Sequence, residues 1–326
     1  MPDRPTLLVL DDTEGLIEAA PAAERLRELA DVRFAGSPVA DLSDNELADV
    51  RVVLAIRERT KFDAATLARF PSLELILQTG GHAYHVDEAA ARASGVAVAL
   101  GRGATAASAA VPELTFALMI GCLRRFPEAQ RGMASGEWPG LVGRCLRGRR
   151  LGLLGVGRLG AGVARIGEAF GMDVVGWQRP GSSGADDGVT RVNLDTLLRT
   201  SDVVSIHLRL SGESRGLLGA RELAMFKPGS VLVNTARGAI VDEAALVDTL
   251  RDGPLAAAGL DVFAEEPLAA DSPLRDLPNV LLTPHVGWTV EEHFEEFAAI
   301  AARQLAAYVS CELDPAELLD PSMSTH

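Results

Sequence analysis

Residues 151–160 read Leu151-Gly-Leu-Leu-Gly155-Val-Gly157-Arg158-Leu159-Gly160, an apolar run of strand length that enters a glycine-rich turn. The turn has the form GxGxxG, which by itself is a weak signal. Here an apolar strand precedes it, an amphipathic helical pattern follows it, and a second apolar run begins at Val174. In that strand–helix–strand setting the pattern predicts a parallel α/β fold with a phosphate-binding turn.

Each glycine of this turn has its own physical reason. Gly155 permits the tight turn, Gly157 lets the backbone approach a pyrophosphate, and Gly160 lets the helix pack close to the strand. The first residues of the helix, Arg158 and Leu159, contribute N–H groups and the positive end of the helix dipole. We therefore expect these five residues to bind a dinucleotide.

The end of the second strand bears on which dinucleotide binds. A carboxylate is expected there to hold the adenosine ribose hydroxyls, but the sequence has Gln178-Arg179, and Asp173 stands at the wrong end of the strand. An arginine in place of a carboxylate favours a 2′-phosphate, so NADP is slightly preferred over NAD. The alternative, in which Arg179 stacks on adenine and NAD is the cofactor, stays open.

Short apolar runs alternate with helical patterns along the chain, which is typical of parallel sheets covered on both faces. The runs form two sets: 6–10, 31–34, 52–56, 73–78 and 96–99, and then 151–155, 174–177, 203–206, 231–234, 257–261 and 280–283. The class predicted is α/β, with two Rossmann-like or flavodoxin-like, doubly wound parallel-sheet domains and a cleft between them.

Two features set the expected domain boundaries. Residues 101–110 are rich in Ala, Gly and Ser and suit a hinge, and a last amphipathic helix carries apolar residues such as Phe294, Phe297 and Leu305 on one face. With the second sheet complete, that helix is expected to return to the first domain. We predict a discontinuous substrate domain, 1–102 plus 287–326, and a dinucleotide-binding domain, 103–286.

Composition narrows the class of protein. The 326 residues include 48% hydrophobic and 23% charged side chains, which is globular composition. A net charge of −14 disfavours nucleic acid and anionic membranes as partners. The longest apolar stretch, 114–123, is too short to cross a membrane, and the run 6–10 is too short for a signal peptide. A cytoplasmic protein is expected.

A metal site is not expected. The three cysteines, Cys122, Cys145 and Cys311, show no paired spacing and are expected to be reduced thiols. His82 and His85 have HxxH spacing, but no third ligand stands near them in the sequence.

Three polar residues stand just past the ends of successive strands in the second set, where open α/β sheets bind their ligands. They are Arg237, Glu266 and His285, each in a context of Gly or Pro. Taken singly, each could be a surface charge, a loop carboxylate or a cap. Their joint placement at one sheet edge predicts a catalytic group.

Several long motifs, in order, are similar to those of the D-2-hydroxyacid dehydrogenase family, whose members include phosphoglycerate, glyoxylate, hydroxypyruvate, formate and phosphite dehydrogenases. The resemblance covers nearly the whole chain and rests on the glycine turn and on the segments 201–208, 226–238, 261–267 and 283–287. It implies hydride transfer between NAD(P)H and a small 2-keto or 2-hydroxy acid of the D-isomer. It also implies a homodimer formed through the cofactor domain.

The resemblance assigns roles to individual residues. It implies that Arg237, Glu266 and His285 are catalytic. Asp261 would hold the nicotinamide carboxamide, and His207 would lie beside the cofactor, as would Thr235 and Ala236 in the segment that precedes Arg237.

The chemistry needs these residue types. Arginine can hold a carboxylate and polarise the neighbouring carbonyl. Reduction of that carbonyl needs a proton, which a histidine can supply, and an adjacent carboxylate favours the protonated ring and fixes its tautomer.

The substrate side of the sequence is less informative. The segment Thr79–Asp87 resembles the family's glycine loop, whose amides hold the substrate carboxylate, but the family's second glycine is His82 here. Gly81, His82, Arg237 and Trp288 are the predicted substrate-binding residues. That His82 and Trp288 serve only packing stays an open alternative.

Two other functions compete with the dehydrogenase. The C-terminal-binding-protein corepressors share this fold and would make the chain a non-catalytic NAD(H)-sensing protein. A phosphite-type dehydrogenase is compatible with the same triad, whereas formate dehydrogenases of the family carry glutamine at the place of Glu266. Turnover of 2-keto acids would decide among these.

Overall fold

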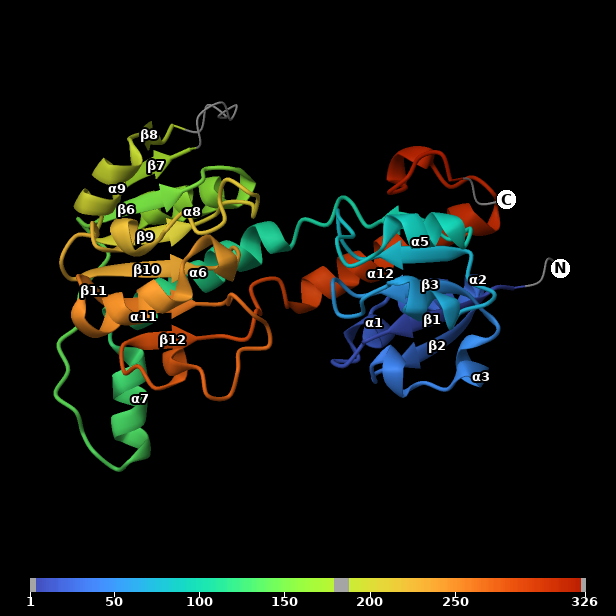
Figure 1. Ribbon diagram of the computed structural model, residues 1–326, viewed down its shortest axis with the longest axis horizontal. Coiled ribbons are helices and arrows are strands. Elements are labelled where there is room, and N and C mark those ends of the chain that lie inside the picture. The colour runs from blue at the N-terminus through green and yellow to red at the C-terminus, as the bar shows by residue number, and fades with distance from the viewer. Residues whose placement is uncertain (1–3, 179–187, 324–326) are drawn as a thin grey trace. The chain divides into compact units, whose positions relative to one another are not determined.

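The computed structural model describes residues 4–178 and 188–323 and shows an α/β chain made of two compact units (Figure 1). The first unit comprises Met1–Ala106 and Thr289–His326, and the second comprises Ala107–Trp288. One sheet has five strands and the other has seven, and all the paired strands are parallel. The predicted class, two parallel-sheet α/β domains, is confirmed. The cleft expected between them stays a prediction.

The first unit has the strand order β2-β1-β3-β4-β5. Strands β1 and β3 are neighbours inside the sheet, with β2 on the far side of β1 and with β4 and β5 on the far side of β3. Its strands are β1 (Thr6–Leu10), β2 (Asp31–Ala35), β3 (Val50–Ala55), β4 (Leu75–Gln78) and β5 (Ala97–Leu100). Its α-helices are α1 (Leu16–Ala19), α2 (Ala23–Leu29), α3 (Asp44–Leu47), α4 (Ala64–Ala68), α5 (Glu88–Ala93) and α12 (Glu291–Val309), with short 3-10 turns η1 (Val39–Asp41) and η4 (Pro315–Glu317).

Helix α12 belongs to the first unit although it comes last in the sequence. Its apolar face, Phe294, Phe297, Ala301, Leu305 and Tyr308, is buried. In Figure 1 this red helix lies among the blue elements, and it packs against α1, α2 and β4. Burial of a continuous apolar stripe explains why the chain returns to the first unit after completing the second sheet.

The second unit has the strand order β12-β11-β10-β9-β6-β7-β8. Its strands are β6 (Arg150–Leu154), β7 (Asp173–Trp177), β8 (Thr190–Arg191), β9 (Val203–Ile206), β10 (Ser230–Asn234), β11 (Leu255–Leu260) and β12 (Val280–Leu282). Its helices are α6 (Ala107–Leu123), α7 (Phe126–Ala134), α8 (Arg158–Ala169), α9 (Leu194–Thr200), α10 (Ala220–Leu223) and α11 (Glu243–Asp252), with 3-10 turns η2 (Gly238–Ile240) and η3 (Pro273–Arg275).

Helices cover both faces of this second sheet. Buried residues of α6 and α8 form one core with β6, β9 and β10, and buried residues of α9, α10 and α11 form the other. Strand order reverses between β6 and β9, so the glycine turn after β6 lies at the switch point where such sheets bind ligands.

In the described part of the chain, no single helix is long and apolar enough to cross a membrane. Helices α6 and α7 reach that length and composition only when taken together, and they are bent by 67° at the break between them. Ten residues of α6 are buried in the core of its own unit or against it, among them Phe116 and Met119.

Candidate active site

The predicted cofactor and catalytic residues of the second unit stand at one edge of its sheet, past the carboxyl ends of six strands. The glycine turn follows β6, Gln178 follows β7, His207 follows β9, Arg237 follows β10, Asp261 and Glu266 follow β11, and His285 follows β12. Parallel strands bring these loops together, because all their carboxyl ends point to the same edge.

The glycine turn has the geometry that a pyrophosphate needs. Gly155 has φ 94°, and a Cβ on Gly160 would lie 2.2 Å from the Gly155 carbonyl oxygen, so α8 starts against the turn. Gly157 caps α8, and a Cβ there would meet no protein atom within 4 Å. There is thus open space beside Gly157 at the start of α8, which a bound phosphate would need.

At the tip of β7, Gln178 is held by an arginine that the sequence did not single out. Arg191 Nε donates to Gln178 Oε1 at 3.1 Å, and Arg191 Nη1 donates to the Val189 carbonyl at 2.6 Å. Arg191 is in β8, a strand of two residues that pairs with β7. The predicted cofactor residue Arg179 lies outside the described residues.

His207 is packed tightly against the glycine turn. Its backbone N–H donates to the Leu154 carbonyl at 2.8 Å, and its Nε2 lies 2.9 Å from Ser205 Oγ. Burial lowers the pKa of His207 to about 4, so the ring is neutral at pH 7. A neutral ring adds no charge to the place where the sequence predicts a cofactor.

Asn234 and Gly238 fix the backbone of the turn that carries Arg237. Asn234 Oδ1 accepts from Ala236 N and Asn234 Nδ2 donates to the Arg237 carbonyl, both at 3.0 Å. A Cβ on Gly238 would lie 1.9 Å from the Phe263 carbonyl carbon, so only glycine fits after the arginine. Asn234 and Gly238 stand in the quoted motif, yet their positioning roles become visible only in the structure.

His285 and Glu266 form the central contact of the site. His285 Nδ1 lies 2.6 Å from Glu266 Oε2, and Glu266 Oε1 accepts from Phe263 N at 3.0 Å. Burial raises the pKa of Glu266, but the hydrogen bonds from His285 and Phe263 N and the charges of His285 and Arg237 outweigh it, and the net pKa is below 4.5. An ionised Glu266 therefore faces both predicted partners at neutral pH.

Asp261 anchors the loop that carries His285. Its carboxylate, 1% exposed, accepts from Thr283 Oγ1 at 2.5 Å, from Val286 N at 2.9 Å and from Gly287 N at 2.9 Å. Burial raises its pKa, and these bonds oppose the rise. Oδ2 takes only one of the three bonds, so a further acceptor position remains for the predicted carboxamide contact.

The remaining predicted residues fall in both units. Thr235 and Ala236 follow β10, and Thr235 Oγ1 lies 3.0 Å from Thr115 Oγ1 of α6. Trp288 is half-buried at the end of the second unit. Gly81 and His82 are in the first unit, in the loop after β4.

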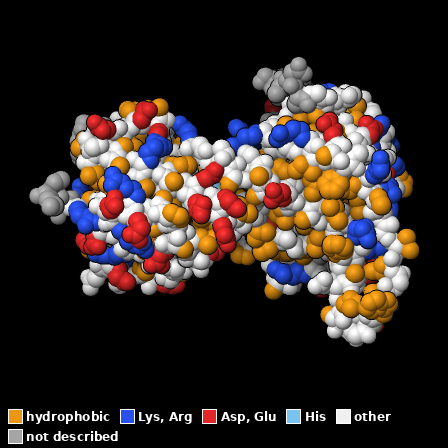
Figure 2. All heavy atoms as spheres, turned by 180° about the vertical axis from the view of Figure 1, so that it is seen from behind, with side chains coloured by type: hydrophobic (Ala, Val, Ile, Leu, Met, Phe, Trp, Pro, Cys, Tyr) orange, Lys and Arg blue, Asp and Glu red, His pale blue; other side chains and the backbone are white. Residues whose placement is uncertain are grey.

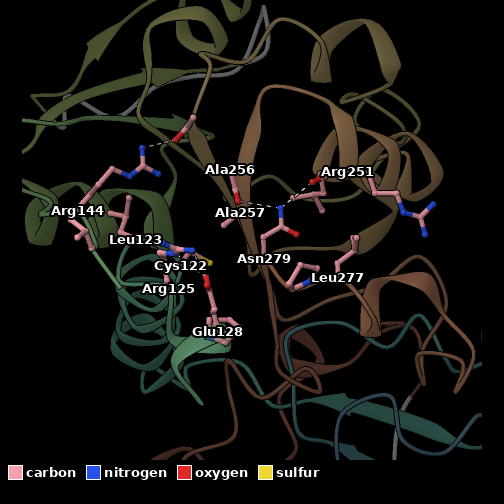
Figure 3. Close-up of a pocket in the computed structure, with 15 residues that line it drawn as sticks. Cys122, Leu123, Arg125, Glu128, Arg144, Arg251, Ala256, Ala257, Leu277 and Asn279 are labelled. Atoms are coloured by element: carbon pink, nitrogen blue, oxygen red, sulfur yellow. Dashed lines mark hydrogen bonds and ion pairs between the residues drawn. The ribbon is translucent and has the colours of Figure 1, made fainter. Parts of the chain in front are cut away.

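Two other observations bear on the location of the site. Within residues 4–178 and 188–323, no group of three His, Cys, Asp or Glu side chains could hold a metal ion. A cavity of about 820 Å³ lies in the second unit (Figure 3), lined by residues such as Arg144, Ala256 and Asn279. These residues precede or begin β6, β11 and β12, so this cavity is at the opposite sheet edge from His285.

Comparison with known proteins agrees with this geometry. Residues 116–287 match the family model described as D-isomer specific 2-hydroxyacid dehydrogenase, NAD binding domain. A glyoxylate reductase of Aeropyrum pernix is 39% identical over 266 residues, which are 78% of this chain and 79% of that protein. An (S)-sulfolactate dehydrogenase of Chromohalobacter salexigens is 40% identical over 260 residues, 78% of this chain and 82% of that protein.

A solved structure extends the likeness to both units. The crystal structure of a putative D-3-phosphoglycerate dehydrogenase oxidoreductase from Ralstonia solanacearum has a TM-score of 0.87 and 32% identity, and the alignment covers 97% of each chain. The order of the motifs, the sheet edge that they share and these matches lead to one conclusion. The chain belongs to the family of D-isomer specific 2-hydroxyacid dehydrogenases.

Proposed function

We propose that the chain is an NAD(P)-dependent D-2-hydroxyacid dehydrogenase that reduces small 2-keto acids to D-2-hydroxy acids and catalyses the reverse oxidation. The observation that carries the proposal is the contact of 2.6 Å between His285 Nδ1 and Glu266 Oε2, at the sheet edge that also carries Arg237. A histidine oriented by a carboxylate beside an arginine is suited to proton transfer at a carbonyl next to a carboxylate.

The second unit fits a nicotinamide dinucleotide. The open backbone at Gly157 and the start of α8 suit the pyrophosphate, with Gly155, Arg158, Leu159 and Gly160 around it. Thr235, Ala236, His207 and Asp261 follow strands at the same sheet edge, which supports a role for them at the nicotinamide half. When bound, the reduced cofactor supplies the hydride that adds to carbon 2 of the substrate.

The chain's own residues then handle the substrate charge and the proton. Arg237 holds the substrate carboxylate and polarises the carbonyl, and Gly81, His82 and Trp288 are the other substrate contacts that we propose. Glu266 accepts a hydrogen bond from Nδ1–H of His285, which leaves Nε2–H to give its proton to the oxygen of carbon 2. In the oxidation, neutral His285 takes that proton back.

A keto-acid panel tests the proposal. Wild-type chain and the His285→Ala variant are assayed with glyoxylate, hydroxypyruvate, pyruvate and phenylpyruvate, each with NADH and with NADPH, and with phosphite in the presence of NAD⁺ or NADP⁺. Reduction of at least one keto acid, lost in the variant, is the expected result. Dinucleotide binding without turnover of any keto acid would favour the NAD(H)-sensing protein, and turnover of phosphite alone would favour the phosphite-type enzyme.

For the cofactor we propose a slight preference for NADP over NAD. The β7 tip offers Gln178 and Arg191 where a ribose-binding carboxylate is expected, and Arg179 follows in the sequence. A charge-assisted contact to a 2′-phosphate is worth about 1.5–3 kcal/mol, or roughly one to two decades of affinity. Arg179→Ala and Arg191→Gln should each weaken NADPH, whereas Gln178→Asp should favour NADH. If the arginine variants lose affinity for NADPH and for NADH equally, the arginines do not bind the 2′-phosphate.

We also propose that the chain is a homodimer through the second unit. Four large apolar side chains in α7 and the segment after it are exposed: Phe126 51%, Met133 55%, Trp138 88% and Val142 85%. Figure 2 shows hydrophobic side chains gathered on one face of this unit. Such a patch usually marks an interface. Analytical ultracentrifugation should show a dimer that Trp138→Glu weakens and Val309→Glu, in the first unit, does not. A monomeric wild type would refute it.

A further inference from the structure

The loop after β5 packs directly against the proposed substrate loop, residues 79–82. Gly80 N and Gly101 N both donate to the Gln78 carbonyl, at 2.8 Å and 2.6 Å. A Cβ on Gly101 would lie 2.7 Å from that carbonyl oxygen and 3.1 Å from Gly80 N, so glycine is required where the two backbones meet. The position of Gly101 therefore sets the position of the backbone at Gln78 and Gly80.

Gln304 of α12 is bonded to the residue at which the β5 loop starts. Its side chain is 1% exposed, and its Nε2 donates to the Leu100 carbonyl at 3.0 Å and to Glu317 Oε2 at 2.8 Å. Leu100 is the last residue of β5 and directly precedes Gly101. The space that Gln304, Gln78 and Gly101 border has no room for a water molecule, so solvent cannot replace the amide as donor.

The segment after α12 returns to the same strand and fixes the other partner of Gln304. Leu319 N donates to the Val98 carbonyl at 2.8 Å, so this segment pairs with β5, the edge strand of the sheet. Glu317 is held as well, because its Oε1 lies 2.6 Å from Arg303 Nη1. Both N–H groups of the Gln304 amide are thus used, one for the β5 loop and one for the returning segment.

We propose that Gln304 is a positioning residue for the substrate loop. By holding Leu100 and Gly101, it keeps Gly80 and Gly81 in the conformation that receives the substrate carboxylate. Gly81 is exposed, and its N–H donates to no group in the described part of the chain, so that N–H is available to a ligand. The inference rests on the proposed function, because it takes this loop as the place of the substrate. Gln304 itself acts only through the backbone of the neighbouring loop.

Steady-state kinetics of two variants test the role of Gln304. Gln304→Met keeps the length of the side chain and removes its donor, so the loop spends less time in the binding conformation and the apparent affinity for substrate falls. We expect KM for the keto acid to rise about fivefold, as the loss of one hydrogen bond would give. The kcat and the dissociation constant of the cofactor should stay within about twofold, because the catalytic candidates and the glycine turn belong to the second unit. Gly101→Ala, which forces the two backbones apart, should raise KM in the same direction.

Tyr308→Phe is the matched control for a loss of stability without a change in the loop. Tyr308 is on the same helix as Gln304, and its hydroxyl donates to Glu74, which directly precedes β4. The variant therefore removes a hydrogen bond between α12 and the end of β4 opposite to the substrate loop. Its denaturation midpoint should fall as that of Gln304→Met does, and its KM should equal that of the wild type.

Hydrogen–deuterium exchange of the full chain keeps this proposal separate from the proposed function, because it needs no turnover. The amides of Gly80 and Gly101, which share the Gln78 carbonyl, should exchange about fivefold faster in Gln304→Met and at the wild-type rate in Tyr308→Phe. That result supports the positioning role even if no keto acid is reduced. Unchanged exchange in Gln304→Met, an unchanged KM with a keto acid that the wild type reduces, or an equal rise of KM in Tyr308→Phe would overturn it and leave the dehydrogenase proposal intact.

Discussion

Two features of His285 support the role in proton transfer that we propose for it. Its φ is 56°, so the loop accepts a strained backbone to place the ring, and Thr283, Val286 and Gly287 tie that loop to buried Asp261. Its Nδ1 contacts Glu266, which leaves Nε2 for the substrate. The predictions at the scale of single residues follow from this arrangement.

Replacing His285 by alanine removes the proposed acid and base. Turnover should fall by a factor of about 10² to 10⁴, the usual contribution of general acid–base catalysis. The glycine turn is untouched, so the dissociation constant of the dinucleotide, measured by fluorescence titration, should stay within about twofold. A variant that keeps more than half of the wild-type turnover would show that another group moves the proton.

Replacing Arg237 by lysine keeps the charge but changes its geometry. A planar fork can hold a carboxylate and a carbonyl together, whereas an ammonium on a flexible stem is a point charge. We expect kcat/KM for the keto acid to fall at least about tenfold, with Arg221→Lys, an exposed arginine of α10, as the matched control. Steady-state kinetics equal to those of the wild type would make Arg237 a structural residue.

Replacing Glu266 by glutamine tests the pairing with His285. Reduction needs a protonated imidazole, so activity is lost as pH rises, and the Glu266 carboxylate stabilises the protonated ring. Removing that charge should move the basic limb of the kcat/KM profile to lower pH. The pKa of Glu266 is lowered, so its side chain is ionised throughout the neutral range. The displacement of the basic limb in the variant can therefore be measured there. An unmoved profile with an unchanged rate would contradict the pairing.

At this scale the sequence shows residue types and order but not their partners. Arg237, Glu266 and His285 could be named because each follows a strand, and parallel strands share an edge. Asn234 accepts from a backbone N–H of the turn that carries Arg237, Arg191 donates to Gln178, and Glu58 contacts His82. No sequence pattern next to these residues indicates such contacts. Arg191 is the clearest case, because its strand has two residues and no apolar run.

At the scale of elements, the glycine turn allows a matched pair of variants. A Cβ on Gly160 would lie 2.2 Å from the Gly155 carbonyl oxygen, whereas a Cβ on Gly157 would meet nothing within 4 Å. Gly160→Ala should therefore destabilise the fold by about 1–3 kcal/mol through overpacking. Gly157→Ala should leave the unfolding free energy nearly unchanged and weaken the dinucleotide by at least tenfold, because its methyl group occupies the open cradle.

Denaturant unfolding and cofactor titration of both variants check this prediction. The reverse pattern, a stable Gly160→Ala and an unfolded Gly157→Ala, would contradict the geometry of the turn. A Gly157→Ala variant with wild-type cofactor affinity would show that the pyrophosphate does not bind beside Gly157.

All eleven strand candidates in the sequence correspond to strands, with ends displaced by up to two residues. The apolar run predicted at 203–206 is β9, and that at 6–10 is β1, because both faces of these strands are largely buried and most residues of each run are hydrophobic. The two-residue strand β8 was missed, since Thr190 and Arg191 carry no apolar pattern and depend on pairing with β7.

At the scale of the whole molecule, both sheets are parallel, but the loops at their carboxyl edges present different side chains. The seven-stranded sheet presents the glycine turn and the three catalytic candidates, and the five-stranded sheet presents a glycine loop bordered by arginines and a histidine. Helix α12 packs within the first unit, so that unit takes two separate segments of the chain. The domain bounds expected from the sequence, 1–102 plus 287–326 and 103–286, stay a prediction.

Isotope transfer tests the central claim, that this chain moves a hydride to carbon 2 of a keto acid, most directly. The full chain is incubated with reduced nicotinamide cofactor carrying two deuterium atoms at carbon 4 and with the best keto acid of the panel other than glyoxylate, and the product is examined by mass spectrometry and chiral chromatography. We predict one deuterium at carbon 2 of the D-hydroxy acid and none in the product formed with unlabelled cofactor. A product of the L configuration, or one without deuterium at carbon 2, would contradict the account.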